Sequence, residues 1–188
     1  MDLQRVRVLI IGDNPFSLWL TRSTLHALNI RTIAEANGVD DGIAALESFA
    51  PDLILVDWEM PPDDGIEFVK RVRSNTKLDA RFTPIILVSG YSEMWRVQVA
   101  RDARVNEYVV KPYTAKALYA KIRAIAENPR PFISAAGGYF GPDRRRRLVV
   151  VAHERRYGRQ TDHGHRESEL PEQNSKSQNY KSRLWGER

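Results

Sequence analysis

The sequence predicts an α/β fold in which five parallel strands form one sheet with helices on both faces. Short aliphatic runs recur along the first 128 residues, helix-like amphipathic segments separate them, and reactive side chains gather where the runs end. Alternation of strands and helices is typical of a parallel sheet that is covered on both faces. A chain of 188 residues with 42% hydrophobic content can bury one sizeable core, so we expect one globular domain with an appendage.

The first strand and helix show this pattern most clearly. The aliphatic run from Val6 to Ile11 is typical of a buried strand. Asn14 is then placed to cap a helix that has Pro15 at its first position, and an apolar stripe continues along that helix to Leu28. The remaining predicted elements are, in order, strand 31–36, helix 39–49, strand 53–57, helix 65–74, strand 84–89, helix 92–104, strand 107–110 and a last helix over 114–128.

Four reactive side chains stand at the ends of predicted strands. Asp13 follows the first strand, Asp57 ends the third, Ser89 ends the fourth and Lys111 follows the fifth. Because the carboxyl ends of parallel strands share one edge of a sheet, these side chains can converge on one pocket. Two carboxylates with backbone oxygen and water suit Mg²⁺, while a lysine and a hydroxyl suit a phosphoryl group.

Four short motifs occur in order at these strand ends, at residues 8–14, 57–61 with 64–65, 87–90 and 108–112. Each motif alone is weak, but the set is specific. Over residues 1–128 the sequence resembles the receiver domain of bacterial two-component response regulators, of the stand-alone, single-domain type. The resemblance implies a flavodoxin-like sheet of five strands in the order 2-1-3-4-5.

The resemblance also implies a chemistry. Asp57 would accept a phosphoryl group from a histidine kinase or a histidine phosphotransfer protein, and Lys111 would pair with the phosphoryl oxygens. Mg²⁺ would be held by Asp13, Asp57 and the backbone carbonyl of Glu59. Catalysis of such a transfer consists mostly of positioning and of stabilising charge on the oxygens. A protein of this kind assists its own phosphorylation and dephosphorylation, and it is a signalling protein rather than a metabolic enzyme.

A conformational switch is the third implication of the resemblance. Ser89 would donate a hydrogen bond to the phosphorylated form only, and its movement would let Tyr108 turn inward. The face formed by the fourth helix, fifth strand and fifth helix would then change shape, with Arg96 among its surface cations. We expect a downstream protein target to bind this face, and a homodimer is a further partner state that we consider.

One position departs from the family pattern. The family usually has two adjacent acids after the first strand, but here the first is Gly12 and only Asp13 remains. The missing acid commonly holds a metal-bound water, so we expect Mg²⁺ to bind more weakly. The chain is then either a working receiver with weakened metal binding or a degenerate receiver that binds partners without phosphorylation. Because Asp57, Ser89 and Lys111 all remain, we favour the first interpretation.

Taken one at a time, the same residues have purely structural explanations. Asp13 could cap a helix, Ser89 could belong to an ordinary turn at a strand end, and Lys111 could be a solvated surface lysine. The four residues in order at strand ends make these explanations the weaker ones. A metabolic enzyme is the least favoured class, because the sequence has neither a glycine-rich phosphate loop nor the signature of a catalytic triad.

Residues 129–188 differ in charge from the predicted domain. The first 128 residues hold 16 Lys and Arg against 17 Asp and Glu, whereas the remaining 60 hold 13 against 7. Pro129 and Pro131 end the last helix, and the Pro-, Gly- and Arg-rich composition beyond them predicts a mostly disordered basic tail. Such a tail cannot build a helix-turn-helix domain, so we expect no sequence-specific DNA binding.

Four consecutive arginines at 144–147 are the strongest feature of that tail. Clusters of this kind are attracted to nucleic acid, to anionic membrane surfaces and to acidic proteins. A solvated run that keeps the protein in solution is the simpler explanation. In the degenerate-receiver interpretation, this tail would bind a partner or nucleic acid.

Composition and the amino-terminal residues bear on the compartment. The chain has no cysteine, which excludes disulfides, thiolate metal sites and cysteine nucleophiles. The first residues lack the apolar core of a signal peptide, and no segment approaches the roughly 18 apolar residues that span a membrane. These observations predict a cytoplasmic protein without a membrane span.

Overall fold

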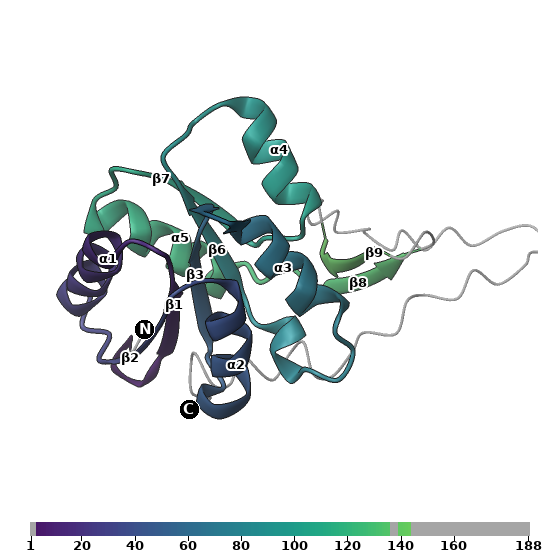
Figure 1. Cartoon of the computed structure of the whole chain (residues 1–188), viewed down its shortest axis with the longest axis horizontal. Coiled ribbons are helices and arrows are strands. Elements are labelled where there is room, and N and C mark those ends of the chain that lie inside the picture. Colours follow the sequence, from purple (N-terminus) through teal and green to yellow (C-terminus); the bar gives the residue numbers. More distant parts are fainter. Residues whose placement is uncertain (1–2, 136–138, 144–188) are drawn as a thin grey trace, which may run out of the picture.

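A computed structural model describes residues 3–135 and 139–143 of the chain (Figure 1). Five strands form one parallel sheet in the order β2-β1-β3-β6-β7. In chain order these strands are β1 (Arg7–Ile11), β2 (Thr32–Ala36), β3 (Leu53–Asp57), β6 (Ile85–Ser89) and β7 (Glu107–Val110). Counted along the five-stranded sheet alone, this is the order 2-1-3-4-5, so the predicted fold is confirmed.

Helices cover both faces of this sheet. They are α1 (Pro15–Ala27), α2 (Val39–Phe49), α3 (Gly65–Ser74), α4 (Met94–Asp102) and α5 (Ala115–Glu127), with short 3-10 helices η1 (Leu3–Arg5) and η2 (Asp79–Phe82). Apolar side chains of α1 and α5 pack on one face, and those of α2, α3 and α4 pack on the other. None of the described helices is long and apolar enough to cross a membrane.

Local sequence explains why the helices begin where they do. The side chain of Asn14 accepts hydrogen bonds from the backbone N–H groups of Phe16 and Ser17, and so caps α1 as predicted. Asp64 caps α3 and Thr114 caps α5 in the same manner. These caps satisfy N–H groups that have no partner inside the helix, and they fix the first turns beside the carboxyl edge of the sheet.

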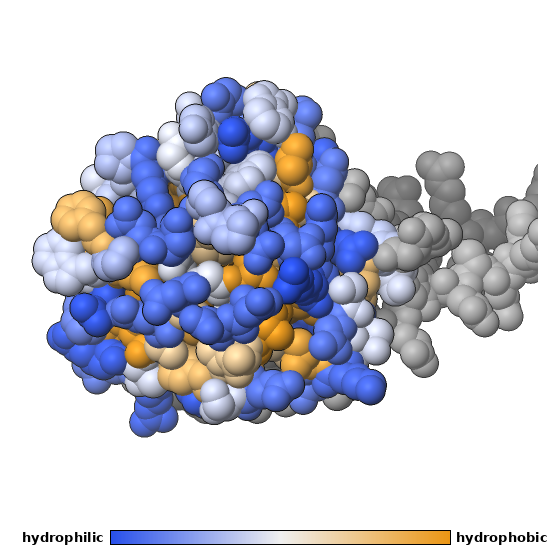
Figure 2. Space-filling model, viewed as in Figure 1, coloured by the Kyte–Doolittle hydropathy of each residue, from blue (hydrophilic) through white to orange (hydrophobic). Residues whose placement is uncertain are grey.

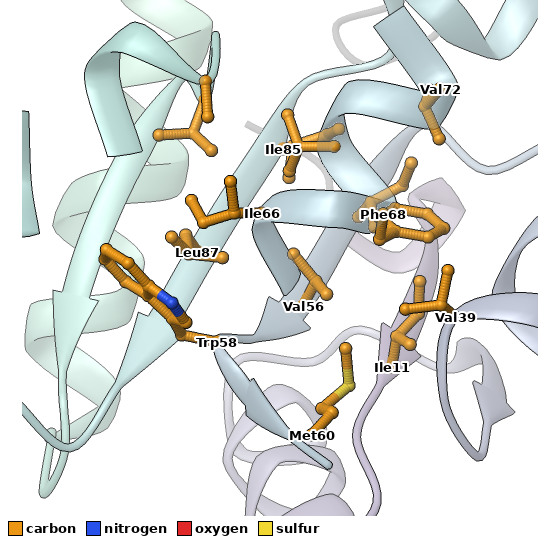
Figure 3. Close-up of a cluster of buried hydrophobic side chains, with 14 of the residues drawn as sticks. Ile11, Val39, Val56, Trp58, Met60, Ile66, Phe68, Val72, Ile85 and Leu87 are labelled. Atoms are coloured by element: carbon orange, nitrogen blue, oxygen red, sulfur yellow. The ribbon is translucent and has the colours of Figure 1, made fainter. Parts of the chain in front are cut away.

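The core lies in two layers, one on each face of the sheet. Figure 3 shows part of the layer under α2 and α3, where Val56 and Leu87 of the sheet meet Ile66 and Phe68 of α3. All five residues of β3 and all five of β6 are buried. Central strands of a parallel sheet are shielded on both faces, which explains their continuous aliphatic sequences.

Helix α4 is shorter than the sequence predicts. It covers Met94–Asp102 instead of 92–104. Its carboxyl end is set by Arg104, which takes the left-handed backbone conformation with φ of 78°, while the N–H of Val105 bonds to the carbonyl of Ala100. A left-handed residue after the last turn is a common way to end a helix, although glycine is the usual choice.

Two short antiparallel hairpins were not predicted. The first joins β4 (Glu59–Met60) to β5 (Asp63–Asp64) immediately after β3. The second joins β8 (Phe132–Ala135) to β9 (Tyr139–Pro142), within the segment that the sequence assigns to the tail. Figure 1 shows this second hairpin beside α3, at the end of the molecule away from α1. Residues 144–147 and the rest of the predicted tail lie outside the described residues.

The β8–β9 hairpin packs on the domain through aromatic rings and cations. The rings of Phe82, Phe132 and Phe140 contact one another with centroids 5.3 to 5.6 Å apart. The guanidinium of Arg81 lies 3.6 Å from the centre of the Phe140 ring. A side chain at Gly141 would come within 2.8 Å of the Cβ of Arg104, so only glycine allows this close approach.

Arg73 is enclosed beneath the hairpin. Its side chain is fully buried, and the guanidinium carbon lies 5.0 Å from the centre of the Phe132 ring. The guanidinium donates to the backbone carbonyls of Arg81, Thr83 and Arg104 and to the side-chain carbonyl of Asn106. These acceptors come from the segments that enter β6 and β7, so Arg73 ties together the amino end of the sheet.

Candidate functional site

The carboxyl edge of the sheet brings the predicted reactive residues together. Asp57 ends β3 and pairs with Val88 of β6, while Ser89 pairs with Val110 of β7, the residue before Lys111. The N–H of Lys111 donates to the carbonyl of Ser89 at 2.8 Å. Asp13 follows β1 at the same edge with an exposed side chain. The register of four neighbouring strands therefore places these residues around one site.

Asp57 is the centre of this site. Its side chain is only 9% exposed, and its Oδ2 atom accepts a hydrogen bond from the ammonium group of Lys111 at 2.8 Å. Ser17 of α1 donates to the same oxygen at 2.9 Å and accepts from Lys111 at 2.8 Å. One oxygen of the carboxylate is thus held by two donors, which also contact each other. Ser17 was not among the predicted site residues.

Two glycines make room for this arrangement. A Cβ atom at Gly12 would lie 3.0 Å from Oδ2 of Asp57 and 3.3 Å from a methyl group of Leu18. A Cβ atom at Gly65 would overlap the backbone carbonyl oxygen of Asp57. Gly65 therefore lets α3 begin directly against the end of β3. The absence of a side chain at Gly12 leaves room for Oδ2 of the Asp57 carboxylate.

Ser89 does not contact Asp57 in this structure. Its side chain is fully buried, and its hydroxyl donates to the carboxylate of Glu59 at 2.8 Å. The N–H of Gly90 donates to the other carboxylate oxygen of Glu59 at 3.3 Å. The sequence predicts a role for the backbone carbonyl of Glu59, but its side chain also takes part, by holding the Ser89 hydroxyl. Ser89 can donate to a group on Asp57 only after it leaves Glu59.

Arg96 of α4 completes this second cluster. One of its guanidinium nitrogens lies 3.5 Å from the Glu59 carboxylate, and the guanidinium lies over the rings of Trp58, Tyr91 and Trp95 at 4.0 to 5.1 Å. The side chain is 20% exposed, so Arg96 does not extend freely into solvent. Arg96 instead connects α4 to the residue that holds Ser89. Stacking of a guanidinium on aromatic rings stabilises such a position.

Tyr108, the predicted switch residue, lies beside this cluster. It is half-buried on β7, its ring meets that of Trp58 edge-on, and its hydroxyl donates to the carbonyl of Tyr91 at 2.6 Å. Burial raises the pKa of the Tyr108 phenol above its ordinary value near 10, so the hydroxyl stays protonated and can donate at neutral pH. The contact with Tyr91 ties the ring to the loop before α4.

The oxygen atoms at this edge suit a hard divalent cation. Asp13 and Asp57 offer carboxylates and Glu59 offers its backbone carbonyl, which is the kind of donor set that Mg²⁺ accepts when water supplies the other positions. Within residues 3–135 and 139–143, no three acidic or histidine side chains gather as a metal site by themselves. Gly12, which stands where the family usually has an acid, adds no carboxylate to this set.

Comparison with known proteins identifies the family. The model of the response regulator receiver domain matches residues 8–123. The chemotaxis protein CheY of Pseudomonas aeruginosa is 31% identical over 122 residues, which are 65% of this chain and 97% of that protein. Chemotaxis protein CheY-3 of Vibrio cholerae is 29% identical over 127 residues, 66% of this chain and 94% of that protein.

Solved structures show the same fold. The chemotaxis protein CheY4 of Vibrio cholerae superposes with a TM-score of 0.58 at 23% identity, covering 64% of this chain and 98% of that one. A CheY-like response regulator receiver domain protein from Methanospirillum hungatei gives a TM-score of 0.55 at 24% identity, covering 63% and 90%. CheY-like receivers are signalling proteins that generally use Mg²⁺. Because the family model covers most of the folded part and the sheet has the family's strand order, this chain belongs to the response regulator receiver domain family.

Proposed function

We propose that this protein is a response regulator that accepts a phosphoryl group on Asp57, with Mg²⁺, and then signals through protein contacts. The donor is a histidine kinase or a histidine phosphotransfer protein. The observation that carries the proposal is the contact between Lys111 and the buried carboxylate of Asp57 at the carboxyl edge of the sheet. A lysine and a carboxylate in that position are suited to bind a phosphoryl group as it is transferred.

The transfer consists of one bond made and one bond broken. A carboxylate oxygen of Asp57 bonds to phosphorus while the phosphorus–nitrogen bond of the phosphohistidine breaks, and the electron pair of that bond returns to the imidazole nitrogen. Negative charge on the three phosphoryl oxygens is then balanced by the ammonium of Lys111, which already lies 2.8 Å from Asp57. Mg²⁺, when bound, screens the charge of the same oxygens. Asp13, Asp57 and the carbonyl of Glu59 would hold it.

The switch begins with the hydrogen bond between Ser89 and Glu59. A phosphoryl group on Asp57 offers Ser89 a charged acceptor, so the hydroxyl exchanges Glu59 for that acceptor. Glu59 then loses one of its partners, and Arg96, which it contacts, loses part of its anchor on the sheet. Because Arg96 belongs to α4, the exchange changes the position of α4 and of Tyr108 beside it.

Two exposed apolar surfaces lie near this site. On α1, the side chains of Phe16, Trp19 and Leu20 are 46% to 69% exposed, and Figure 2 shows apolar groups at that end of the molecule. On α4, Met94 and Trp95 are 72% and 56% exposed. The α1 surface adjoins Ser17 and suits the phosphoryl donor, which must approach Asp57. The α4 surface adjoins Arg96 and suits the downstream target.

Phosphorylation by a small donor tests the proposal without knowledge of the kinase. Phosphoramidate has the same phosphorus–nitrogen bond as phosphohistidine. With Mg²⁺, the wild-type chain should gain one phosphoryl group, seen by intact-protein mass spectrometry, and lose it on treatment with hydroxylamine. Asp57→Asn should gain none, while the matched variant Asp41→Asn, which changes an exposed aspartate of α2, should behave as wild type.

Chelation of Mg²⁺ separates this proposal from the alternative function. A receiver that works through Asp57 should lose most of its phosphorylation when EDTA is added. A folded wild-type protein that gains no phosphoryl group at any Mg²⁺ concentration would favour the alternative, a phosphorylation-independent interaction module. That alternative rests on Asp13 being the single acid after β1.

A further inference from the structure

We infer that Ser17 is a further residue of the phosphoryl site, where its hydroxyl holds the Asp57 carboxylate before transfer and donates to the phosphoryl group afterwards. This inference rests on the function proposed above and deepens it. The hydroxyl lies 2.9 Å from Oδ2 of Asp57 and 2.8 Å from the nitrogen of Lys111. It therefore touches both residues that carry the proposed chemistry.

The direction of each hydrogen bond gives Ser17 its role. Lys111 has only protons to donate, so the Ser17 oxygen accepts from Lys111 and its own proton goes to Asp57. Oδ2 of Asp57 is then held by Lys111 and Ser17 together. Within the described residues the other oxygen, Oδ1, makes no protein hydrogen bond. The side chain is thus held by one oxygen while the other remains available to a metal or to phosphorus.

Ser17 is one of the helix hydroxyl residues that bond outside their own helix, as Thr21 also does through the hydroxyl of Tyr113. Thr24, Ser48 and Ser74 donate to backbone carbonyls of the preceding turn of their own helices, which is the usual local bond of such residues. Ser17 instead reaches across to β3. Its backbone N–H is already bonded to the side chain of Asn14, so the hydroxyl has no capping role to fill.

Gly12 and Ser17 form a matched pair. Both lie beside Oδ2 of Asp57: a Cβ atom at Gly12 would come within 3.0 Å of that oxygen, and the Ser17 hydroxyl donates to it at 2.9 Å. Where the family usually has an acid at the first position, this chain has no side chain there, and it has a neutral donor at Ser17. The site therefore carries one negative charge fewer than the family pattern, and Ser17 supplies a neutral donor beside Asp57. Both features favour an incoming anionic phosphoryl group, and the first disfavours Mg²⁺.

Four variants test the inference through binding of beryllofluoride, whose fluorines stand in for the phosphoryl oxygens. Ser17→Val and Ser17→Thr have nearly the same shape and differ in the hydroxyl, and Ser17→Ala is matched by Ser23→Ala on the same helix. We would titrate each full-length protein with beryllofluoride at fixed Mg²⁺, follow amide shifts of Asp57 and Lys111, and record the fluorine NMR spectrum of the bound ion.

The expected result is a loss of affinity wherever the hydroxyl is removed. Ser17→Ala and Ser17→Val should bind beryllofluoride about tenfold more weakly, which corresponds to one hydrogen bond to a charged group. One bound fluorine resonance should also shift. Ser17→Thr should stay close to wild type, and Ser23→Ala should be indistinguishable from it.

Failure of the inference and failure of the proposed function look different. If wild type binds beryllofluoride and Ser17→Ala and Ser17→Val bind it equally well, Ser17 has no role at the phosphoryl site. If Ser17→Thr is as weak as Ser17→Val, shape and not the hydroxyl is responsible, and the inference is again wrong. If folded wild type itself does not bind, the proposed function fails and takes this inference with it.

Discussion

Lys111 and Arg73 are cations held at opposite ends of the same sheet, and they are held in different ways. Lys111 keeps 31% of its side chain exposed and bonds to groups that can exchange, the carboxylate of Asp57 and the hydroxyl of Ser17. Arg73 is fully buried and donates to backbone carbonyls and to Asn106, beneath a ring of the β8–β9 hairpin. Three of its acceptors are backbone carbonyls, and the fourth is the buried side chain of Asn106.

The two ends of the sheet therefore differ in whether their polar contacts can be exchanged. At the carboxyl edge, the proposed function gives these contacts a competing partner, since a phosphoryl group on Asp57 would attract Lys111 and would take Ser89 from Glu59. At the amino edge, the Arg73 contacts leave no such choice. We therefore expect substitutions at the first end to change function and substitutions at the second to change stability.

Removal of the Arg73 guanidinium should have the largest effect on stability. Arg73→Met leaves several buried carbonyls without a donor, and we expect the free energy of unfolding to fall by about 3 to 5 kcal/mol. Urea denaturation measures this. Arg71→Met is the matched control on the same helix, because its partners Glu67 and Asp40 are at the surface, and it should change stability little. Equal losses for the two variants would contradict the comparison.

Removal of a ring from the aromatic cluster should cause the next largest loss of stability. Phe132 is buried between Phe82 and Phe140, and Phe132→Ala should lower the free energy of unfolding by about 3 kcal/mol. Affinity for beryllofluoride should not change in the fraction that stays folded. If Phe132→Ala were as stable as wild type, the β8–β9 hairpin would not contribute to the stability of the domain.

Lys111→Met should affect phosphorylation strongly and stability little, which is the reverse of the two preceding variants. Phosphorylation by phosphoramidate should be lost almost entirely, while the free energy of unfolding should change by about 1 kcal/mol or less, because the Lys111 side chain is partly exposed. Rate measurements and urea denaturation on the same preparation would show both effects. A large loss of stability with normal phosphorylation would reverse the roles assigned to the two ends.

Glu59→Ala should produce the smallest change, an increase in affinity for beryllofluoride. Without Glu59, the hydroxyl of Ser89 no longer has a competing acceptor, so beryllofluoride should bind about threefold more tightly. Glu93→Ala removes the neighbouring acid, whose carboxylate lies 3.8 Å from Arg96, and serves as control. Weaker binding by Glu59→Ala would show that Glu59 supports the phosphorylated form.

The sequence predicts the strands, the helices and the four residues at the strand ends because their signals are local. Aliphatic runs end in Asp57 or Ser89, and a cap residue precedes each helix that borders the site except α4. The order of strands came from the resemblance and not from periodicity. These features can be predicted from residues that are close in the sequence, or from the fact that the ends of parallel strands share one edge of the sheet.

The remaining features depend on contacts between distant segments. Ser17 reaches Asp57 across 40 positions and Lys111 across 94, and its helical position alone does not indicate which way its hydroxyl points. A predicted cap at Asn14 would place Ser17 in the first turn beside the strand ends, and that is the one signal that could have found it. The β8–β9 hairpin was missed because its segment is rich in Pro and Gly, and its aromatic contacts lie outside the domain's regular pattern.

An amide NMR comparison of wild type and Asp57→Asn, each with and without Mg²⁺ and beryllofluoride, tests directly whether Asp57 is the phosphoryl site. We predict shifts at Asp13, Ser17, Ser89 and Lys111 in wild type, none of them in Asp57→Asn, and unchanged amides at Arg73 and Phe132. Shifts of equal size at Asp57's edge and at Arg73's edge of the sheet would show that the contacts at both ends change on binding, which contradicts the comparison of the two ends. An unchanged wild-type spectrum at saturating Mg²⁺ would contradict the proposed phosphoryl site itself.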